Sequence, residues 1–489
     1  MTTPFEAAED AEDVLDVVDA EDDVVAYFDQ LLPTTRRALL HRVAVAQAEG
    51  RSPSLVGAVV REGKTVWSGG WGAVDGWAPD ADTQYRIGSI TKTFIAVLVM
   101  RLCDEGLLDL GDPLRAHLDL AGAPPEAGDA TVTQLLAHTA GLSAEARGPW
   151  WERTDGALRP ELTDVFGEGA QPHPAGRRHH YSNPGFALLG ALVERLRGGT
   201  PWHEVLRREV LEPLGMARTS PLPEAPHAQG WAVHPWADVL QPEPAVDTGL
   251  MGPAGQLWST AGDLGRFAAF LLRGDERVLS ADTLARMREP ASGPRDENWQ
   301  GGYGLGVQLT RSHGRLLFGH TGSMPGFVSA LWANEAEDVA GIALANATAG
   351  PLTGAVAADL VRIVAEREPR LPRPWQPLPA ADPELLALTG PWYWGATPLA
   401  LRLRADRGLE LRPLAAQGRA ARFRAEADGT WTGLDGYYAG EVLRVVRTAS
   451  GEVSHLDIGT FVFTRQPYEP GDAAVPGGVH PEGWGGQPG

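Results

Sequence analysis

The chain has 489 residues, a formal net charge of −21 and an isoelectric point near 5.0. This length is sufficient for a large core divided over two or three domains. Because nucleic acids and anionic membrane surfaces repel an acidic protein, the charge predicts no nucleic-acid partner and no membrane partner.

The amino-terminal segment is the most acidic part of the chain. Residues 1–29 contain eleven carboxylates and no Lys or Arg, which predicts a solvated acidic tail over residues 1–30. The first basic residues, Arg36 and Arg37, do not precede an apolar stretch, so no secretory signal is expected. The single cysteine, Cys103, cannot form an internal disulfide, which fits a reducing compartment. These features predict a cytoplasmic protein.

The next elements in the chain predict a large domain over residues 31–367. Two apolar, strand-like runs joined by a short turn predict a β-hairpin over residues 54–71. A helix that is apolar on nearly every side follows Ser89 and is expected to end at Gly106. Further helices are expected over residues 184–197 and 263–273.

Two stretches of this domain, residues 144–180 and 217–247, have no clean period. Long irregular segments often form the walls of a binding site. They contain four tryptophans that would give such a site an aromatic lining: Trp150, Trp151, Trp231 and Trp236. The same tryptophans are equally compatible with half-buried positions in ordinary surface loops.

A boundary is expected between residues 368 and 383, where six prolines predict a stiff linker. Beyond it, short apolar alternations and regularly spaced turn signals predict an antiparallel, barrel-like β-domain over residues 384–468. Strands are expected near residues 399–403, 409–411, 442–445 and 461–463. The Gly- and Pro-rich residues 469–489 predict a disordered tail.

The strongest chemical signal is Ser89-Ile90-Thr91-Lys92, at the start of the apolar helix. A spacing of three places the hydroxyl and the amine on one helix face. A serine is a poor nucleophile until a base takes its proton, and burial lowers the pKa of a lysine enough for it to be that base. The chain has forty arginines and only two lysines, Lys64 and Lys92. Arginine cannot lose its proton in a protein, so a position that needs a neutral amine must keep lysine.

A second element is Tyr181-Ser182-Asn183. In an extended segment, residues two apart face the same way, so the Tyr181 phenol and the Asn183 amide are expected to point together. A phenolate held near Lys92 could transfer a proton between the serine and a leaving group. On its own, the tripeptide is more consistent with an ordinary loop tyrosine than with a catalytic one.

The third element is His320-Thr321-Gly322-Ser323, which follows a strand-like run. Gly322 would let a substrate approach the backbone closely, and the N–H groups of Ser323 and Ser89 would form an oxyanion hole. His320 is expected to titrate near neutrality and to shape the pH profile. A lone histidine is more often structural, so the order of the three motifs along the chain carries the prediction.

These motifs resemble the serine β-lactamase and penicillin-binding protein family, in its branch of esterases, D-aminopeptidases and D,D-carboxypeptidase-like hydrolases. The resemblance runs from about residue 54 to residue 365 and includes residues 131–142, 213–216 and 252–264. It implies an α+β fold in which an antiparallel sheet flanked by helices lies beside an all-helical lobe. It also implies acyl-serine chemistry without a metal or cofactor. The β-domain that follows is similar, more loosely, to the lipocalin-like appendage of some members.

One departure from the family pattern concerns charge. The third motif often begins with Lys in the family, whereas here it begins with His320. The fixed positive charge that holds a substrate carboxylate is therefore weakened. Histidine at this place resembles the esterase and peptidase branch and argues against strong β-lactam hydrolysis.

Three functions fit the motifs. The first is hydrolysis of an ester or a small D-amino-acid-type peptide or amide, with a small-molecule or short-peptide acyl substrate bound to Ser89. The second is acyl transfer, as in a peptide-cyclising thioesterase, where an amine replaces water. The third is a non-catalytic receptor or scaffold of the same fold. An α/β-hydrolase and a zinc protease are disfavoured, because no Ser lies in a Gly-x-Ser-x-Gly elbow and no His-Glu-x-x-His occurs.

Overall fold

A computed structural model describes residues 31–120, 125–156, 169–293, 300–371, 374–378, 380, 382–415 and 418–468. The chain divides into two compact units, Met1–Arg370 and Leu371–Gly489. The predicted tails, residues 1–30 and 469–489, lie outside the described residues. In the described part of the chain, no helix is both long and apolar enough to cross a membrane.

The first unit is built on a seven-stranded antiparallel sheet in the order β2-β1-β11-β10-β9-β8-β7. Its strands are β1 (Ser54–Arg61), β2 (Lys64–Gly72), β7 (Gly301–Tyr303), β8 (Gln308–Ser312), β9 (Arg315–Met324), β10 (Phe327–Asn334) and β11 (Val339–Ala345). The predicted hairpin is confirmed, because β1 pairs with β2 across a two-residue turn. The sheet therefore brings the start of the unit together with its end, where β1 pairs with β11.

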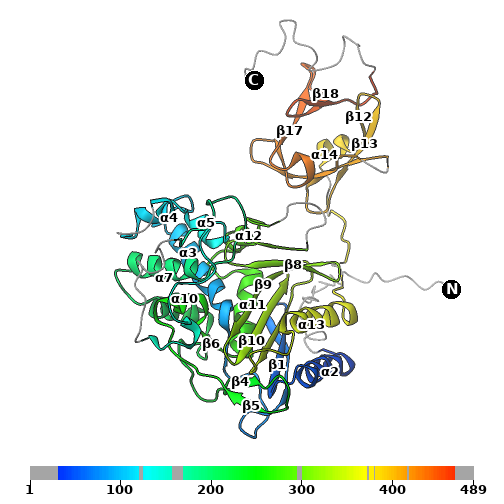
Figure 1. Ribbon diagram of the computed structural model, residues 1–489. Helices are drawn as coiled ribbons and strands as arrows, with labels where there is room; N and C mark the ends of the chain where they lie inside the picture. The colour runs from blue at the N-terminus through cyan, green and yellow to red at the C-terminus, as the bar shows by residue number, and fades with distance from the viewer. Residues whose placement is uncertain are drawn as a thin grey trace, which may run out of the picture. The chain divides into compact units, whose positions relative to one another are not determined.

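Helices cover both faces of this sheet (Figure 1). On one face, α2 (Pro33–Glu49) and α13 (Thr353–Arg367) pack with Leu55 and Val59 of β1 in one apolar cluster. On the other face, α11 (Ala261–Arg273) packs in the main cluster with Val56, Ala58 and Val60 of the same strand. A central strand buried on both faces is apolar at nearly every position, which accounts for the almost continuous apolar run in β1.

A helical lobe lies beside the sheet (Figure 1). Its helices are α3 (Thr91–Asp104), α4 (Pro125–Gly128), α5 (Val132–Leu136), α7 (Asn183–Leu196), α8 (Trp202–Leu206), α9 (Glu212–Leu214), α10 (Gly252–Gly255) and α12 (Ala281–Arg288). The helices predicted after Ser89, from residue 184 and from residue 263 are confirmed as α3, α7 and α11. Gly106 has φ +72° two residues beyond the end of α3, where a left-handed residue ends a helix at little cost.

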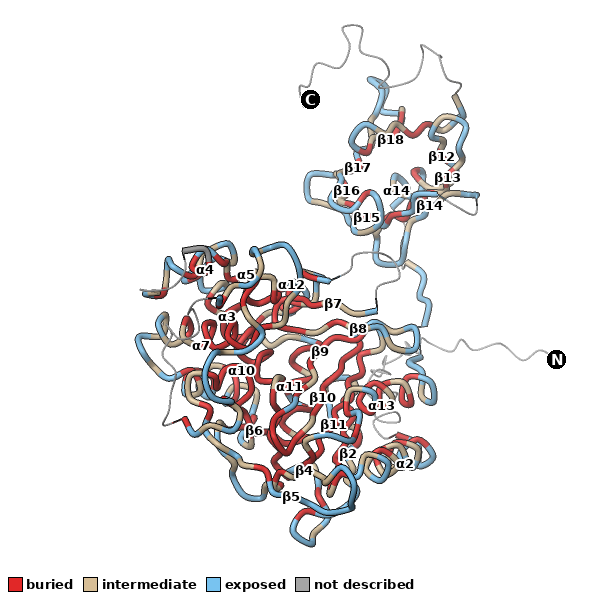
Figure 2. Tube along the Cα trace, viewed as in Figure 1, coloured by how far each residue is buried: buried red, intermediate tan, exposed pale blue. Residues whose placement is uncertain are grey.

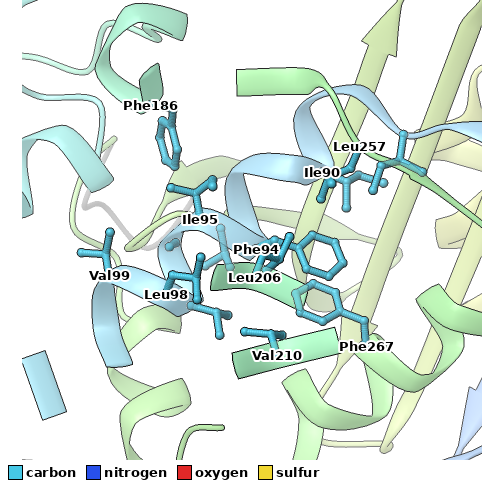
Figure 3. Close-up of a cluster of buried hydrophobic side chains, with 14 of the residues drawn as sticks. Ile90, Phe94, Ile95, Leu98, Val99, Phe186, Leu206, Val210, Leu257 and Phe267 are labelled. Carbon is cyan, nitrogen blue, oxygen red and sulfur yellow. The ribbon is translucent and has the colours of Figure 1, made fainter. Parts of the chain in front are cut away.

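Helix α3 is buried on all sides, as Figure 2 shows by its burial colour. Phe94 stacks on Phe267 of α11 with ring centroids 3.8 Å apart, and Phe186 of α7 lies on another side (Figure 3). Fully burying one such side chain contributes about 1.5–3 kcal/mol, so these contacts hold the start of α3 rigidly. Rigidity at this point matters because Ser89 and Lys92 lie there.

Short strand pairs connect the sheet to the helical lobe. Strand β3 (Tyr85–Arg86) pairs with β6 (Trp258–Ser259), and β4 (Trp231–Val233) pairs with β5 (Leu240–Pro242). The second pair lies within the stretch at 217–247 that showed no clean period. Its three-residue strands are too short to produce a readable alternation.

The second unit is an eight-stranded antiparallel meander that is nearly closed into a barrel. After α14 (Pro383–Leu388) its strands are β12 (Gly390–Trp394), β13 (Thr397–Leu403), β14 (Leu409–Pro413), β15 (Ala421–Ala425), β16 (Trp431–Gly433), β17 (Val442–Arg447), β18 (Val453–Ile458) and β19 (Phe461–Phe463). Tyr393 and Thr464 exchange two backbone hydrogen bonds that join the ends of the meander. Strands β13, β14, β17 and β19 match the predicted ones.

Large side chains form the core of this barrel. Trp392, Phe423 and Phe463 are at most 1% exposed and belong to one cluster with leucines from the intervening strands. Small barrels are filled in this way, whereas ligand-carrying barrels keep a cavity. The packing therefore gives this domain its own core.

Candidate active site

Ser89, the predicted nucleophile, is half-buried in a short 3₁₀ turn, Gly88–Ile90, that leads directly into α3. This turn packs against β9, where Ser323 lies. A Cβ on Gly88, which has φ +52°, would be 2.5 Å from the Ser323 backbone nitrogen, and a Cβ on Gly322 would be 1.9 Å from the Ile87 oxygen. Only glycine tolerates such an approach. These two glycines therefore let the backbones of Ser89 and Ser323 lie side by side, as an oxyanion hole requires.

The amine of Lys92 is wholly buried and lies 3.0 Å from the Ser89 hydroxyl oxygen. It also donates to Asn183 Oδ1 at 2.7 Å and to the Ala254 carbonyl at 2.6 Å. Burial lowers its pKa to about 7, against the charges of Glu145 and Glu152, which raise it. A neutral amine has two N–H groups and one lone pair. The two fixed acceptors can take the N–H groups, which leaves the lone pair for the Ser89 proton.

Tyr181 lies on the other side of this pair. Its ring centroid is 4.9 Å from Lys92 Nζ, and its hydroxyl is hydrogen-bonded to the Ser89 side chain. Burial raises the pKa of Tyr181 above its usual value of 10, although the Ser89 hydrogen bond opposes this. The phenolate expected from the sequence is therefore wrong for the resting site, where a desolvated phenol keeps its proton. Lys92 is the group that can accept a proton near neutral pH.

Asn183 reaches Lys92 from the first turn of α7. Ser182 is extended, with φ −137° and ψ 116°, and its hydroxyl accepts a hydrogen bond from the Gly185 N–H at 3.1 Å. The expected extended tripeptide is thus an N-cap followed by a helix. Tyr181 and Asn183 both lie near the Lys92 amine, as predicted. The N-cap places them there, and not the alternation of side chains along a strand.

His320 is buried in β9, with its ring centroid 6.3 Å from that of Tyr181. Its Nδ1 lies 2.5 Å from the Thr321 carbonyl, which can only accept, so Nδ1 carries the proton. Its Nε2 then accepts from the Tyr303 hydroxyl at 2.9 Å. Burial, followed by the Lys92 charge, lowers the pKa of His320 to about 3. The expectation that it titrates near neutrality is wrong, because burial and the nearby Lys92 charge both disfavour the charged imidazolium.

Two aromatic residues next to this histidine were not singled out from the sequence. Tyr303, on β7, is 2% exposed, and burial raises its pKa well above 10. His138 is also buried, and its Nδ1 accepts from the Ser182 N–H at 3.0 Å. Its ring centroid is 4.2 Å from that of Tyr181. The sequence did contain a signal for each residue. Tyr303 lies between glycines, and His138 lies inside the 131–142 motif.

A third missed residue is Glu145, in the first irregular stretch. Its two carboxylate oxygens accept hydrogen bonds from Asn183 Nδ2 at 2.8 Å and from Trp151 Nε1 at 2.7 Å. Trp151 is 9% exposed, whereas Trp150 and Trp236 are 60% and 90% exposed. The four tryptophans therefore do not form one lining. Only Trp151 among these three is buried, and it holds a carboxylate beside the site.

The two irregular stretches are joined by an ion pair. The Arg153 guanidinium contacts both carboxylate oxygens of Glu243, at 2.6 Å and 2.5 Å, and Glu243 is 6% exposed. Thr348 donates to the same carboxylate at 2.8 Å. A bidentate pair of this kind fixes orientation as well as distance. It holds the segment containing Glu145 and Trp151 against the β4–β5 hairpin.

Among the described residues, no group of three or more His, Cys, Asp or Glu side chains is placed to hold a metal ion. The adjacent His179 and His180 point to different partners, Ser292 Oγ at 3.0 Å and the Leu142 carbonyl at 2.8 Å.

The comparisons with known proteins agree with this architecture. Residues 39–366 match the family model described as beta-lactamase. The chain belongs to this family. Residues 381–465 match a model described as a domain of unknown function, DUF7586.

Particular relatives agree with this assignment. Penicillin-binding protein 4 of Amycolatopsis lactamdurans is 32% identical over 271 residues, which cover 52% of this chain and 70% of that protein. Two further curated relatives are matched over about half of their length, 54% and 46%.

Solved structures share the fold. A penicillin-binding protein homologue from Pyrococcus abyssi, described as octameric, has a TM-score of 0.60 and 21% identity, covering 87% of this chain and 99% of that one. The D-amino acid amidase from Ochrobactrum anthropi SV3 has a TM-score of 0.56 and 24% identity, covering 68% and 98%. The family and the α+β fold predicted from the sequence are confirmed. The roles assigned to Ser89, Lys92, Tyr181 and His320 stay predictions.

Proposed function

We propose that this member of the beta-lactamase family is a serine hydrolase that cleaves an ester or a small D-amino-acid-type peptide or amide through an acyl-Ser89 intermediate. The observation that carries the proposal is the Lys92 amine, wholly buried, 3.0 Å from the Ser89 oxygen and with a pKa lowered to about 7. A base is most effective when its pKa lies near the working pH.

Acylation follows from this arrangement. Neutral Lys92 takes the Ser89 proton as the oxygen attacks the substrate carbonyl, and the N–H groups of Ser89 and Ser323 stabilise the oxyanion. The Tyr181 phenol, hydrogen-bonded to the Ser89 side chain, donates a proton to the departing alcohol or amine. The proton held by Lys92 replaces the one that Tyr181 gives up. Water then attacks the ester in the same way, which releases the acid and restores the Ser89 hydroxyl.

The charge of His320, on the strand side of the site, affects which substrates can bind. His320 is neutral at physiological pH, because its pKa is lowered to about 3. It therefore supplies no positive charge for a substrate carboxylate. This supports an ester or amide substrate over a β-lactam or a carboxylate-terminated peptide.

The test is covalent labelling followed by a substrate panel. A fluorophosphonate probe should add one label to the intact protein and none to Ser89→Ala, as read by intact-mass spectrometry. The panel comprises simple esters, D-amino acid amides, nitrocefin, D-Ala-D-Ala peptides and peptidyl thioesters with and without an added amine. Undiminished labelling of Ser89→Ala would refute the nucleophile. Release of product only when an amine is present would replace hydrolysis by acyl transfer, and no labelling of the wild type would favour a scaffold.

A further inference from the structure

His138 lies just beyond the end of α5, in a backbone conformation that residues other than glycine rarely adopt. Its φ is +55°, in the left-handed region. The Thr139 N–H donates to the Gln134 carbonyl at 2.8 Å. The His138 N–H donates to the Leu135 carbonyl at 3.2 Å, so α5 ends in a Schellman motif, whose left-handed position is usually taken by glycine. A side chain that is held there at a cost in strain points to a function.

Two acceptors of His138 hold the segment that contains Tyr181. The His138 carbonyl accepts a hydrogen bond from the His180 N–H at 2.8 Å. The His138 imidazole accepts a second one through Nδ1, from the Ser182 N–H at 3.0 Å. These two N–H groups flank Tyr181 in the sequence. One residue therefore fixes the backbone on both sides of the phenol.

The imidazole of His138 is neutral, and its tautomer is fixed. Burial, followed by the Lys92 charge, lowers the pKa of His138 well below 6.5. Because Nδ1 accepts from a backbone N–H, the ring proton lies on Nε2. Within the part of the chain that the structure describes, Nε2 has no hydrogen-bond partner. The ring therefore makes one hydrogen bond among these residues, and it makes it to the residue after Tyr181.

The same ring also packs against the phenol ring of Tyr181. The two ring centroids are 4.2 Å apart, and the ring planes are inclined by 35°. His138 is 2% exposed and also contacts Tyr303, with ring centroids 4.6 Å apart. Closely packed rings cannot shift without displacing their neighbours. His138 thus restrains Tyr181 through the backbone and through the ring, while the Tyr181 hydroxyl is hydrogen-bonded to the Ser89 side chain.

We propose that His138 is a positioning residue for Tyr181, which it holds at Ser89 by accepting a hydrogen bond from the Ser182 N–H. The proposal rests on the proposed acyl-Ser89 chemistry, in which Tyr181 donates a proton to the leaving group. His138 acts on the reaction only through Tyr181. A displacement of about 1 Å at a reacting group can slow a reaction about a hundredfold. Loss of the acceptor should therefore slow those substrates whose leaving group needs a proton.

The test compares two variants that both tolerate a left-handed backbone. His138→Asn keeps an acceptor, because the asparagine Oδ1 can take the place of the imidazole Nδ1, and asparagine adopts positive φ more readily than most residues. His138→Gly keeps the backbone bond to the His180 N–H and removes the acceptor for Ser182. Both variants lose the ring, so the difference between them isolates the hydrogen bond. Urea unfolding of each variant establishes that it folds.

The readout is the dependence of kcat/KM on the leaving group. The substrates are the p-nitrophenyl, phenyl and ethyl esters of the acyl group that the wild type hydrolyses fastest, because these leaving groups need increasing help from a proton donor. His138→Gly should lower kcat/KM about tenfold or more for the phenyl and ethyl esters and less than about threefold for the p-nitrophenyl ester. His138→Asn should stay within about threefold of the wild type for all three. In a Tyr181→Phe background, His138→Gly should add less than about threefold for any ester.

A histidine outside the site provides the matched control. His313 also has a left-handed backbone, with φ +49°, and lies exposed in the turn between β8 and β9. His313→Gly makes the same chemical change at the same backbone conformation. It should leave the leaving-group dependence of the wild type unchanged.

The outcomes separate this role from the proposed function. Equal losses for the three esters in His138→Gly, or an equally large loss in His138→Asn, would overturn positioning through the acceptor, while labelling of Ser89 by the fluorophosphonate probe leaves the serine chemistry standing. An undiminished loss in the Tyr181→Phe background would also overturn it. Wild-type leaving-group dependence in Tyr181→Phe would leave no proton donor to position and would overturn it as well. Absence of labelling in the wild type would remove the proposed function itself.

Discussion

The two sides of the active site each contain a wholly buried titratable group, yet the two groups behave differently. On the helix side, Lys92 has two fixed acceptors, the Ser89 hydroxyl and two nearby carboxylates around it, and its pKa is lowered only to about 7. On the strand side, His320 has one carbonyl that favours its charge and the repulsive charge of Lys92 against it, and its pKa is lowered to about 3. Burial is the largest cause in both. The neighbours decide which group can still exchange a proton at neutral pH.

The variant Lys92→Arg, which tests the buried group on the helix side, should have the largest effect. Arginine keeps a positive charge and cannot act as a base, so acylation should fall by about 10²–10⁴-fold. The measurement is the rate of p-nitrophenyl ester turnover and of fluorophosphonate labelling. Lys64→Arg is the matched control, because Lys64 is the other lysine of the chain and is exposed in β2. Full activity in Lys92→Arg would rule out the proposed base.

The pH profile sharpens the comparison. Because Lys92 must be neutral to act, kcat/KM should rise with pH through an acid limb near pH 7. Glu145 favours the charged amine, so its neutralisation in Glu145→Gln should move this limb to lower pH. An N-acetylated substrate avoids titration of the substrate amine in this experiment. A limb that moves to higher pH would contradict the assigned sign.

The variant His320→Asn tests whether the buried group on the strand side contributes to the pH profile. Since His320 is already neutral above its lowered pKa of about 3, the acid limb should stay near pH 7 in this variant. Lost packing lowers the activity equally at every pH, so the position of the limb is the informative readout. A displaced limb would make His320, and not Lys92, the titrating group.

The contact between Tyr303 and His320 gives a smaller effect. Tyr303→Phe removes the donor to a buried Nε2, which should cost about 1–3 kcal/mol of unfolding free energy. Urea denaturation followed by tryptophan fluorescence measures it. No change in stability would mean that this nitrogen finds another donor.

The smallest expected effect concerns the cap that orients Tyr181 and Asn183. Ser182→Ala removes the hydroxyl that accepts from Gly185 and donates to the Ser143 carbonyl, at about 1 kcal/mol. The unfolding free energy and the labelling rate should fall together, because the cap places Asn183 beside Lys92. Thr260→Ala, which removes the corresponding cap of α11, should lower stability alone.

The sequence predicted the local parts of this architecture well. The hairpin β1–β2, the helices α3, α7 and α11, and four strands of the barrel were all predicted from periodicity and turn signals, which depend on neighbours in the chain. Strands β4, β5 and β16, three residues each, were missed, whereas β19, equally short, was predicted from Phe461 and Phe463. A run of three residues is too short for a period of two to be a dependable signal. Strands β12 and β18 lack a clear alternation of apolar and polar residues. Strand β15 alternates apolar residues with arginines but was not predicted.

Within the site, the pair Ser89 and Lys92 was determined by the sequence itself, because a spacing of three on a helix brings two side chains together whatever surrounds them. The partners Glu145, His138 and Tyr303 come from distant segments, and only tertiary packing makes them neighbours. The protonation states were also decided there. Desolvation and nearby charge depend on what is packed around a group, so the neutral His320 and the protonated Tyr181 could not be predicted from the sequence. The spacing to Ser89 predicts Lys92 as a base, and that role stays a prediction.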